Sequence, residues 1–554
     1  MAARPVDIQH ETVHVKWDKS RPFTCPTCGA KLEHVYNDGG RRVETIKGSL
    51  WVVTNFYRCK NENCEMHAAF SPVHESTLKR KKHGMDVWAK VIQHHFKHHI
   101  DYKTISEVMW DDWEVEISPG TVQSVCESFE IAAQPVITGK VKDRMKTVEK
   151  VVVSLDGAQP EKGRPAFWTF TDHASGSQLH GQFFETANWE KLVEVFYNIE
   201  KTYGIKIKGF ISDKQKNIVK AVREFRQGSL HAFCQYHFLD HVAEPIAAKD
   251  SHLLTKLRSD IRDLSIVNAH TVQDLKPVGS DSPVRDIFAP IVEELKCAIA
   301  TSGDMIKVFP GIEAYANLEH VFRGLQSCND LEMPFRARRS YNTLVSSIED
   351  ILTRYKPLEE EIAALLMDFN LLRAALSHRH WSGARVKKSV DRWVYMLQCR
   401  LKRRGLEYKP ASIKQVTATY TTQFPEAWQE WIRLVHSYEA GLYVAYDDPD
   451  FAFTNNDEEN RFHRLKYRFK KWLGRGKFTL QFEKHAGNYM NLLNFDFTTK
   501  NITDVLLAME TTVVNEGRQQ LHAFYATTMR TGRIREKDTG NLALFKQNLK
   551  RLTR

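Results

Sequence analysis

The sequence predicts a multidomain α/β protein, and three observations lead to this fold class. Four of the nine cysteines form two pairs near the N-terminus. From residue 150 the hydrophobic pattern changes to a succession of strands and helices, and between residues 246 and 450 apolar residues recur at helical spacing. A chain of 554 residues is too long for one hydrophobic core, so we expect several domains.

The composition excludes several classes of protein. With 42% hydrophobic and 11% aromatic residues, the chain has enough apolar side chains for packed cores, which excludes a mainly disordered protein. The 27 Gly and 18 Pro residues exclude a collagen-like or low-complexity architecture. The mean hydropathy is -0.45 and no apolar run is long enough to span a bilayer, so no membrane association is expected. The N-terminal residues lack the apolar core of a signal peptide, which indicates a cytoplasmic protein.

Charge and cysteine usage indicate the kind of partner and the compartment. The 79 Lys and Arg residues exceed the 68 Asp and Glu residues, which gives a net charge of +11. An excess of positive charge favours a polyanionic partner if it is concentrated on one surface. An odd number of cysteines in a chain without a signal peptide is typical of a reducing interior rather than of a disulfide framework.

Residues 1–78 contain two short cysteine turns, which predict a zinc-binding module. The turns are spaced C-x2-C and C-x4-C: Cys25 with Cys28, and Cys59 with Cys64. Four thiolates match the tetrahedral preference of Zn²⁺, and because they leave no open coordination position the single zinc would be structural. Residues 43–46 and 51–57, between the two pairs, are predicted strands. The alternatives are that His67 replaces one cysteine or that the four thiols are unrelated.

Residues 79–145 combine basic and helical features, which predict a helix-turn-helix DNA-binding domain. The segment begins with four consecutive basic residues: Lys79, Arg80, Lys81 and Lys82. Three helical stretches follow, and Ser118 as N-cap with Pro119 at the first helical position marks the start of the third. Gln123 and Ser124 would lie near the start of that helix, where a recognition helix contacts bases. The alternative is a plain helical bundle.

Four histidines lie close together in the first of these helical stretches: His94, His95, His98 and His99. Their clustering in sequence resembles a metal site. On a helix, however, they would spread over two faces, so we expect a solvated or phosphate-facing surface instead.

Residues 146–245 alternate between strands and helices. Strands are predicted at 151–157, 166–171, 178–184, 207–212 and 230–234, and helices at 189–203, at 218–225 and after residue 234. The resulting order is β-β-β-α-β-α-β-α. Three antiparallel strands, followed by two strands added through helical crossovers, are expected of an RNase H-like core.

Two aspartates in this segment end apolar strands. Asp156 ends the first strand and Asp213 the fourth, and a carboxylate there is costly unless it binds something. In an RNase H-like sheet these strands are neighbours, so the carboxylates would lie side by side and a divalent cation would relieve their repulsion. Hard oxygen ligands favour Mg²⁺ or Mn²⁺ over Zn²⁺. The alternative for Asp213 is a helix cap.

Residues 451–500 contain an amphipathic helix with acidic residues at its start. Its apolar stripe consists of Phe462, Leu465, Phe469 and Trp472. Eight Lys and Arg residues lie within 461–477, and six of them are predicted to contact the DNA backbone: Arg461, Arg464, Lys466, Arg468, Lys470 and Lys471. A plain basic amphipathic helix is the alternative, but it leaves the acids Glu458 and Glu459 unexplained.

Four motifs follow one another along the predicted core: S-L-D-G-A-Q-P at 154–160, S-D at 212–213, C-Q-Y-H at 234–237 and T-N-N-D-E-E at 454–459. In this order they resemble the motifs of DDE transposases from prokaryotic insertion sequences, which are related to the Mutator-like group. The resemblance covers residues 150–500, and the upstream zinc module and helix-turn-helix fit the same family plan. It implies an RNase H-like catalytic core in two parts, 146–245 and 451–500.

The resemblance also implies a site and a reaction. Asp156, Asp213 and Glu459 match the three acids that hold two Mg²⁺ (or Mn²⁺) ions per active site in this family. Water would free a 3′-OH at a transposon end, and that 3′-OH would attack target DNA. The family often has an apolar residue at the position before the third acid, where the present sequence has Glu458. Helical phasing places Glu458 nearer the apolar stripe than Glu459, and Glu458 is the rival third acid. The implied partners are double-stranded DNA and further copies of the chain, as a homodimer or higher oligomer on the prokaryotic nucleoid.

Residues 246–450 separate the two parts of the core, which predicts an α-helical insertion domain. Such insertions occur in Mutator-like and hAT transposases, and this one would contact the transposon end or a flipped base. Trp381 is a candidate stacking residue there, with a buried core position as the alternative. Cys234 and His237 are expected to be a structural pair, although two soft ligands on one turn also suggest zinc. The tail, 501–554, is predicted to be helical.

Three other functions are compatible with parts of the sequence. A domesticated, non-catalytic DNA-binding protein would not need all three acids. An RNase H-like nuclease would cleave DNA without strand transfer. A zinc-stabilised interaction scaffold would leave the aspartates at the strand ends unexplained.

Overall fold

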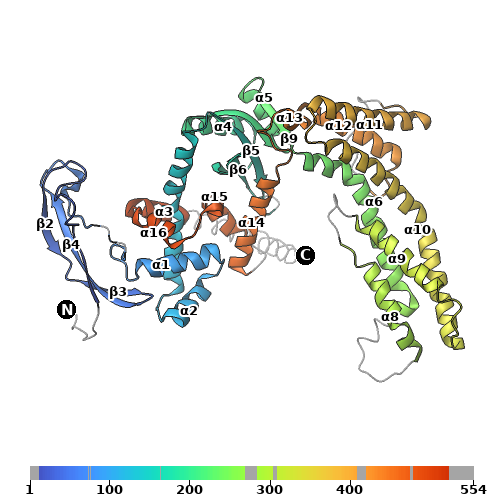
Figure 1. Ribbon diagram of the computed structural model, residues 1–554, viewed down its shortest axis with the longest axis horizontal. Coiled ribbons are helices and arrows are strands. Elements are labelled where there is room, and N and C mark those ends of the chain that lie inside the picture. Colours follow the sequence, from blue (N-terminus) through green and yellow to red (C-terminus); the bar gives the residue numbers. More distant parts are fainter. Residues whose placement is uncertain are drawn as a thin grey trace, which may run out of the picture. The chain divides into compact units, whose positions relative to one another are not determined.

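Figure 1 shows the computed structural model, which describes residues 11–72, 74, 76–161, 164–268, 283–302, 309–408, 419–474 and 478–522. The fold is mixed α/β, as predicted, and mostly helical with two small sheets. The chain divides into two compact units. Unit 1 comprises Met1–Val151, Leu155–Lys206 and Asp457–Arg554, and unit 2 comprises Val152–Ser154 and Ile207–Asn456.

The N-terminal sheet of unit 1 is organised around one long strand. Its strands are β1 (Glu11–Val15), β2 (Leu32–Asn37), β3 (Arg41–Thr45) and β4 (Gly48–Cys59). Strand β4 pairs in parallel with β1 and antiparallel with β2 and β3. The turn from β3 to β4 places Gly48 at φ +116°, a conformation that favours glycine. The predicted strands at 43–46 and 51–57 are confirmed within β3 and β4, whereas β1 and β2 were not predicted.

The three helical stretches predicted after the basic residues are confirmed. They are α1 (Met85–Ile92), which continues as a π-helical turn η2 (Gln93–Lys97), α2 (Tyr102–Trp113) and α3 (Pro119–Met145). Ser118 caps α3 as predicted, because its Oγ accepts a 3.2 Å hydrogen bond from the amide of Thr121. Glu114 ends α2 in the left-handed conformation, with φ +53°.

The helices of unit 1 share one hydrophobic core although they lie far apart in the sequence. Helices α14 (Asn456–Leu473), α15 (Thr479–Asn491) and α16 (Thr499–Leu507) pack with α1, α2 and α3. Stacked aromatic rings join the two groups, with Phe96 and Phe497 5.7 Å apart between ring centroids. The segments 79–145 and 451–500, which we predicted as separate domains, therefore share a core.

The second sheet follows the predicted element order. Its strands are β5 (Lys150–Ala158), β6 (Ala166–Asp172), β7 (Gln178–Phe184), β8 (Lys206–Ser212) and β9 (Leu230–Phe233), and its connecting helices are α4 (Trp189–Tyr203) and α5 (Lys216–Phe225). The strand order is β7-β6-β5-β8-β9. Strands β6 and β7 are antiparallel, and β8 and β9 are parallel.

Helices make up the described part of unit 2 that follows β9. They are α6 (Gln235–Asp263), α8 (Pro283–Ala298), α9 (Pro310–Gln326), α10 (Phe335–Leu376), α11 (Gly383–Arg403), α12 (Phe424–Leu442) and the short α13 (Val444–Asp447). The predicted helical periodicity is thus confirmed. The boundary that we placed at residue 246 is not a break in the chain, because α6 runs continuously through it.

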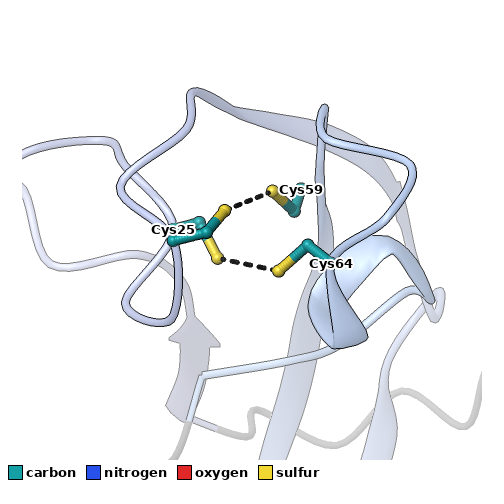
Figure 2. Close-up of side chains that lie close together, drawn as sticks. Cys25, Cys59 and Cys64 are labelled. Atoms are coloured by element: carbon teal, nitrogen blue, oxygen red, sulfur yellow. Dashed lines mark hydrogen bonds between the residues drawn. The ribbon is translucent and has the colours of Figure 1, made fainter.

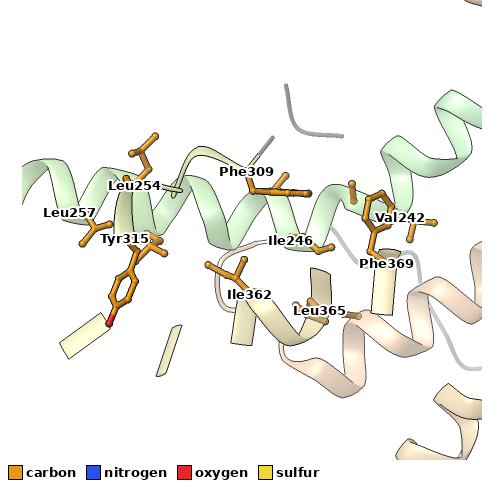
Figure 3. Packing of buried hydrophobic residues seen from close by; sticks show 14 of the residues in the cluster. Val242, Ile246, Leu254, Leu257, Phe309, Tyr315, Ile362, Leu365 and Phe369 are labelled. Carbon is orange, nitrogen blue, oxygen red and sulfur yellow. The ribbon is translucent and has the colours of Figure 1, made fainter. Parts of the chain in front are cut away.

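One hydrophobic core holds these helices together, as Figure 3 shows for Ile246 of α6 beside Ile362 and Leu365 of α10. All three side chains are fully buried. Trp431 of α12 adds a polar link, since its indole donates a 2.7 Å hydrogen bond to the carbonyl of Val242. Within the described residues, no helix is both long enough and apolar enough to cross a membrane.

Candidate functional site

The four N-terminal cysteines lie together with the geometry of a metal site. Figure 2 shows the sulfurs facing one another in two pairs. The Sγ atoms of Cys25 and Cys64 are 3.7 Å apart, those of Cys28 and Cys59 are 3.5 Å apart, and all four lie within 4.8 Å of one another. Tetrahedral zinc with Zn–S bonds of about 2.3 Å requires separations of about 3.8 Å between sulfurs. The cluster therefore fits one zinc ion.

Local backbone geometry builds this cluster. Cys25 and Cys28 occupy a turn that closes with a 2.9 Å hydrogen bond from the amide of Gly29 to the carbonyl of Cys25. Cys59 ends β4, and Cys64 caps the short helix η1 (Glu65–His67). Burial acts to raise the pKa of Cys25, but the backbone amides of Cys28 and Thr27 outweigh it and lower that pKa to about 6, whereas burial raises the pKa of Cys59. A thiolate is the form that binds zinc.

Histidines take no part in this cluster. The Nδ1 of His67 is 3.0 Å from the backbone carbonyl of Cys59, so the alternative of a histidine ligand is not needed. The four cysteines are the one group of three or more metal-ligating side chains that the described residues bring together. We expected a solvated or phosphate-facing surface for His94, His95, His98 and His99, but only His98 is exposed, whereas His94 and His99 are half-buried. His95 is instead buried, with its Nε2 2.7 Å from the hydroxyl of Tyr489.

Asp156 lies near the C-terminal end of β5 in unit 1, as predicted. Its Oδ1 accepts a 2.7 Å hydrogen bond from the amide of Gly157. A side chain at Gly157 would not fit, because a Cβ there would lie 2.6 Å from the indole of Trp168 on β6. The D-G sequence therefore combines the partly buried carboxylate of Asp156 with close packing of the Trp168 ring against Gly157.

Asp213 follows β8 directly in unit 2. Its Oδ2 accepts a 2.8 Å hydrogen bond from the side-chain amide of Gln215. Its Oδ1 is buried without a hydrogen-bond partner in the part of the chain that the structure describes. An unpaired buried carboxylate oxygen costs about 1–3 kcal/mol or more unless a cation binds it. The N-cap of α5 is Gln215, so the helix-cap alternative for Asp213 is wrong.

Glu458 and Glu459 lie in the first turn of α14 and have different surroundings. Glu458 is 1% exposed, and its Oε2 accepts a 2.7 Å hydrogen bond from the hydroxyl of Thr169 on β6. The Nε of Arg461 is 3.9 Å from the same oxygen. Glu459 is only partly buried. Glu458 thus attaches α14 to β6, and the phasing that we predicted, with Glu458 nearer the apolar side, is confirmed.

Cys234 connects two motifs of unit 2. Its Sγ accepts a 3.2 Å hydrogen bond from the amide of Asn455, and its own amide donates a 2.9 Å hydrogen bond to the carbonyl of Ser212. The next amide, that of Gln235, donates to the carbonyl of Phe453 at 2.8 Å. In the described residues no third ligand joins Cys234 and His237 in a metal cluster. These contacts give Cys234 a structural role.

The basic stretch at 79–82 is only partly free for a ligand. Lys82 forms an ion pair with Glu44 at 3.3 Å, and the Nζ of Lys79 lies 5.9 Å from the ring centroid of Phe56. Burial lowers the pKa of Lys81, and the positive charge of Arg518 lowers it further. Lys79, Arg80 and Lys81 line a cavity of about 460 Å³ in unit 1.

The two side chains predicted to contact bases have partners within unit 1. The amide of Gln123 donates a 3.1 Å hydrogen bond to the carboxylate of Glu127. The Oγ and the carbonyl oxygen of Ser124 both accept hydrogen bonds from the guanidinium of Arg518. Base contacts by Gln123 and Ser124 stay predictions, since each would first have to give up a contact.

The predicted basic face of α14 is exposed in part. Arg464, Lys470 and Lys471 are exposed, and Lys466 and Arg468 are half-buried. Burial lowers the pKa of Arg468 to about 10. Arg461 differs from the rest, because it is 7% exposed and donates a 2.6 Å hydrogen bond to the carbonyl of Gly176. Arg461 is therefore a packing residue rather than a surface contact. Residues 475–477 of the predicted basic segment, and 523–554 of the tail, lie outside the described residues.

Trp381 is held on both sides by its neighbours. The ring of His378 stacks on it at 3.9 Å between centroids, and the guanidinium of Arg385 lies 4.0 Å from its centroid. The ring is half-buried. A base would have to displace one of these neighbours, which does not favour Trp381 as a stacking residue.

Two features of the site had no signal in the sequence. Thr169 lies in the middle of β6 and has no acidic or basic neighbour to mark it, yet it holds Glu458. The cationic side chains around Lys214 come from α5, which follows it directly, and from α12, which is distant along the chain. Pairing across such distances is visible only after folding.

Comparisons with known proteins do not extend these observations, because neither a family model nor a curated protein matches the chain. The fold and the site therefore define a mixed α/β protein with a four-cysteine cluster that is suited to a structural zinc.

Proposed function

We propose that this protein is a DNA transposase of the DDE class, which cleaves DNA at transposon ends and joins the freed ends to target DNA. One observation carries the proposal: Asp213, which directly follows β8, has one buried carboxylate oxygen without a protein partner among the described residues. The strand order supports it further, since β8 neighbours β5, the strand of Asp156. Acids at the ends of adjacent strands suit a divalent cation.

The proposed core is RNase H-like and interrupted by a helical insertion. Support comes from the element order, in which three strands precede α4 and two further strands follow through crossovers. The helices α6 to α13 separate β9 from the acidic start of α14. In this interpretation the helical part of unit 2 is the insertion, and α14 returns the chain to the catalytic core.

The proposed site would hold two Mg²⁺ or Mn²⁺ ions through Asp156, Asp213 and Glu459. Bound ions of this kind activate an attacking oxygen and stabilise the leaving 3′-oxygen. The protein's own part is to fix the acids in place. The hydrogen bond from Thr169 to Glu458 holds the start of α14, so that Glu459 is presented on a different side of the helix. The exposed basic residues of α14 would hold phosphates.

The four-cysteine cluster is proposed to hold one Zn²⁺ that stabilises the N-terminal sheet. Double-stranded DNA, at the transposon ends and at the target, is the proposed partner, and joining two ends calls for a dimer or higher oligomer. The proposed location is the nucleoid of a prokaryotic cell.

A cleavage and strand-transfer assay tests the proposal. The full chain is incubated with DNA that flanks its own gene, with Mg²⁺, Mn²⁺ or no divalent ion. We expect metal-dependent cleavage and joining, and losses of at least about a hundredfold for Asp156→Asn, Asp213→Asn and Glu459→Gln. His463→Gln, an exposed change on the same helix as Glu459, is the matched control.

Each outcome of this assay decides between functions. Cleavage without joining identifies a nuclease, and specific binding without cleavage identifies a DNA-binding protein that has lost catalysis. Full activity of Asp156→Asn would falsify the two-metal mechanism. Loss of cleavage by a stably folded Glu458→Gln beside an active Glu459→Gln reverses the choice of third acid.

A further inference from the structure

A cationic cavity in unit 2 lies directly beside Asp213 in the chain. Its volume is about 450 Å³, and Lys214, Lys216, Lys220, Arg223 and Arg433 contribute to its wall. Lys214 comes from the loop after β8, three of these residues come from α5, and Arg433 comes from α12. The cavity therefore joins Arg433 to four cations that lie close together in the sequence.

The positive charges of the cavity exceed its negative charges. Its two carboxylates already have cationic or imidazole partners within the same wall. Glu430 accepts a 2.8 Å hydrogen bond from the Nε of Arg433, and an oxygen of Glu244 is 2.8 Å from the Nδ1 of His241. Arg223 pairs with the exposed Glu224 at 3.4 Å, and an ion pair on the surface neutralises little. An anion would balance the remaining charge.

Lys214 packs against a buried aromatic ring. Its Nζ lies 4.7 Å from the ring centroid of Tyr438, which is 4% exposed. Lys216 and Arg433 line the same cavity, so like charges crowd together there. A bound anion would relieve this crowding of like charges.

The wall of the cavity favours a phosphate over a base. The ring of Tyr438 packs against Phe238 at 5.1 Å and Phe233 at 5.7 Å between centroids, while Lys214 covers another side. The ring of Tyr438 is therefore not presented as a platform on which a base could stack. Lysine and arginine side chains around a concave surface are suited to phosphate oxygens instead.

We propose that this cavity binds a phosphate of the DNA strand. This phosphate would neighbour the scissile phosphate at the proposed metal site of Asp213. The inference rests on the proposed function, because it assumes that Asp213 faces a scissile phosphate. Lys214 follows Asp213 directly, so a phosphate in the cavity would be close along the strand to the reacting one. The cavity would fix the register of the substrate at the acids, and its cations are positioning residues.

Substitution of the cavity's cations tests the proposal by DNA binding without divalent ions. The cavity variant of the full chain carries K216Q, K220Q and R223Q. The control variant carries K256Q, R262Q and K402Q, which remove the same charge from exposed helical positions of unit 2. Fluorescence anisotropy with a labelled duplex from the gene's flank gives the affinity and its salt dependence for both variants and for the wild type.

We expect the cavity variant to bind DNA at least about tenfold more weakly than the control. Its salt slope on duplex DNA should be smaller by about 0.9 for each phosphate that the variant no longer neutralises. In the presence of Mg²⁺, the cavity variant should also cleave at shifted positions or more slowly at saturating DNA. Equal thermal unfolding midpoints of the two variants show that both are folded.

Three results separate the possible failures. Binding and salt slope equal to those of the control overturn the proposal. A second result is that millimolar inorganic phosphate protects the wild type against thermal unfolding while the cavity variant binds DNA as the control does. This result assigns the cavity to a free small anion and also overturns the proposal. A cavity effect on DNA binding in a protein that never cleaves leaves the DNA contact in place and rejects the proposed transposase activity.

Discussion

The backbone amide of Asn455 donates a 3.2 Å hydrogen bond to the Sγ of Cys234. This bond joins the end of β9 to the loop that leads into α14, although more than two hundred residues separate the two in the chain. The C-x-x-H and T-N-N motifs thus meet through a buried sulfur, which is 0% exposed.

Removal of this sulfur should loosen the loop before α14. Cys234→Ala leaves the amide of Asn455 without its acceptor, and such a loss costs about 1–3 kcal/mol. We expect a lower thermal unfolding midpoint and slower DNA cleavage. Cys234→Ser, which keeps an acceptor, should retain more of both. Equal midpoints for Cys234→Ala and the wild type would show that the bond contributes nothing to stability.

The cysteine cluster predicts one zinc per chain. Elemental analysis of the purified protein should give a ratio near one, and Cys28→Ser should lose the metal because three thiolates bind more weakly than four. Cys297→Ser, a change at an exposed cysteine outside the cluster, is the control and should keep it. Retention of zinc by Cys28→Ser would contradict the assignment, and so would a metal-free wild type.

Glu458 and Thr169 should be coupled in stability. A double-mutant cycle with Glu458→Ala and Thr169→Val should give a coupling of about 0.5–3 kcal/mol in chemical unfolding of the full chain. Glu459→Gln should leave stability close to that of the wild type while it abolishes cleavage. Additive effects of Glu458→Ala and Thr169→Val would show that the hydrogen bond between them is not formed.

Unit 1 should lose stability in mild acid through His95. Burial is the main cause that lowers its pKa to about 3, with the charges of His485 and His99 acting in the same direction and Asp101 opposing them. The usual pKa of an unfolded histidine is about 6.5, so the unfolded chain binds more protons between these values. Stability is therefore full above about pH 6.5 and falls by about 1.4 kcal/mol for each pH unit below it.

Thermal unfolding between pH 7 and pH 5 tests this dependence. The variant His95→Gln should be less stable at pH 7 but should lose less stability on acidification than the wild type. His463→Gln, a change at an exposed histidine, serves as control and should follow the wild type. A wild-type midpoint that does not change over this range would refute the role of His95.

Gly157 should tolerate no larger residue. In Gly157→Ala the new Cβ would lie 2.6 Å from the indole of Trp168, so the ring or the strand must move, at a cost of about 1–3 kcal/mol. Gly139→Ala in α3 meets no atom within 4 Å and should stabilise the helix by up to about 1 kcal/mol. Unfolding midpoints that shift in the same direction for both variants would contradict this packing argument.

The local elements could be predicted from the sequence because their signals are local. Ser118 and Pro119 mark the start of α3 through capping and a restricted backbone angle, and they do so without reference to the rest of the chain. The cysteine spacing likewise predicts a cluster, since two short turns leave few other ways to arrange four thiols. The alternation of apolar residues predicts β5 to β9 and their helices.

The tertiary structure alone decided which of these elements share a core and which polar groups meet. The basic residue Arg461 looks like its exposed neighbours on α14, yet folding buries it against the carbonyl of Gly176. Likewise, the guanidinium of Arg518 donates a hydrogen bond to the hydroxyl of Ser124, the side chain for which a base contact was predicted. Hydrophobic periodicity identifies a buried face but not the surface that covers it, because burial is non-directional and a partner distant along the chain leaves no local pattern.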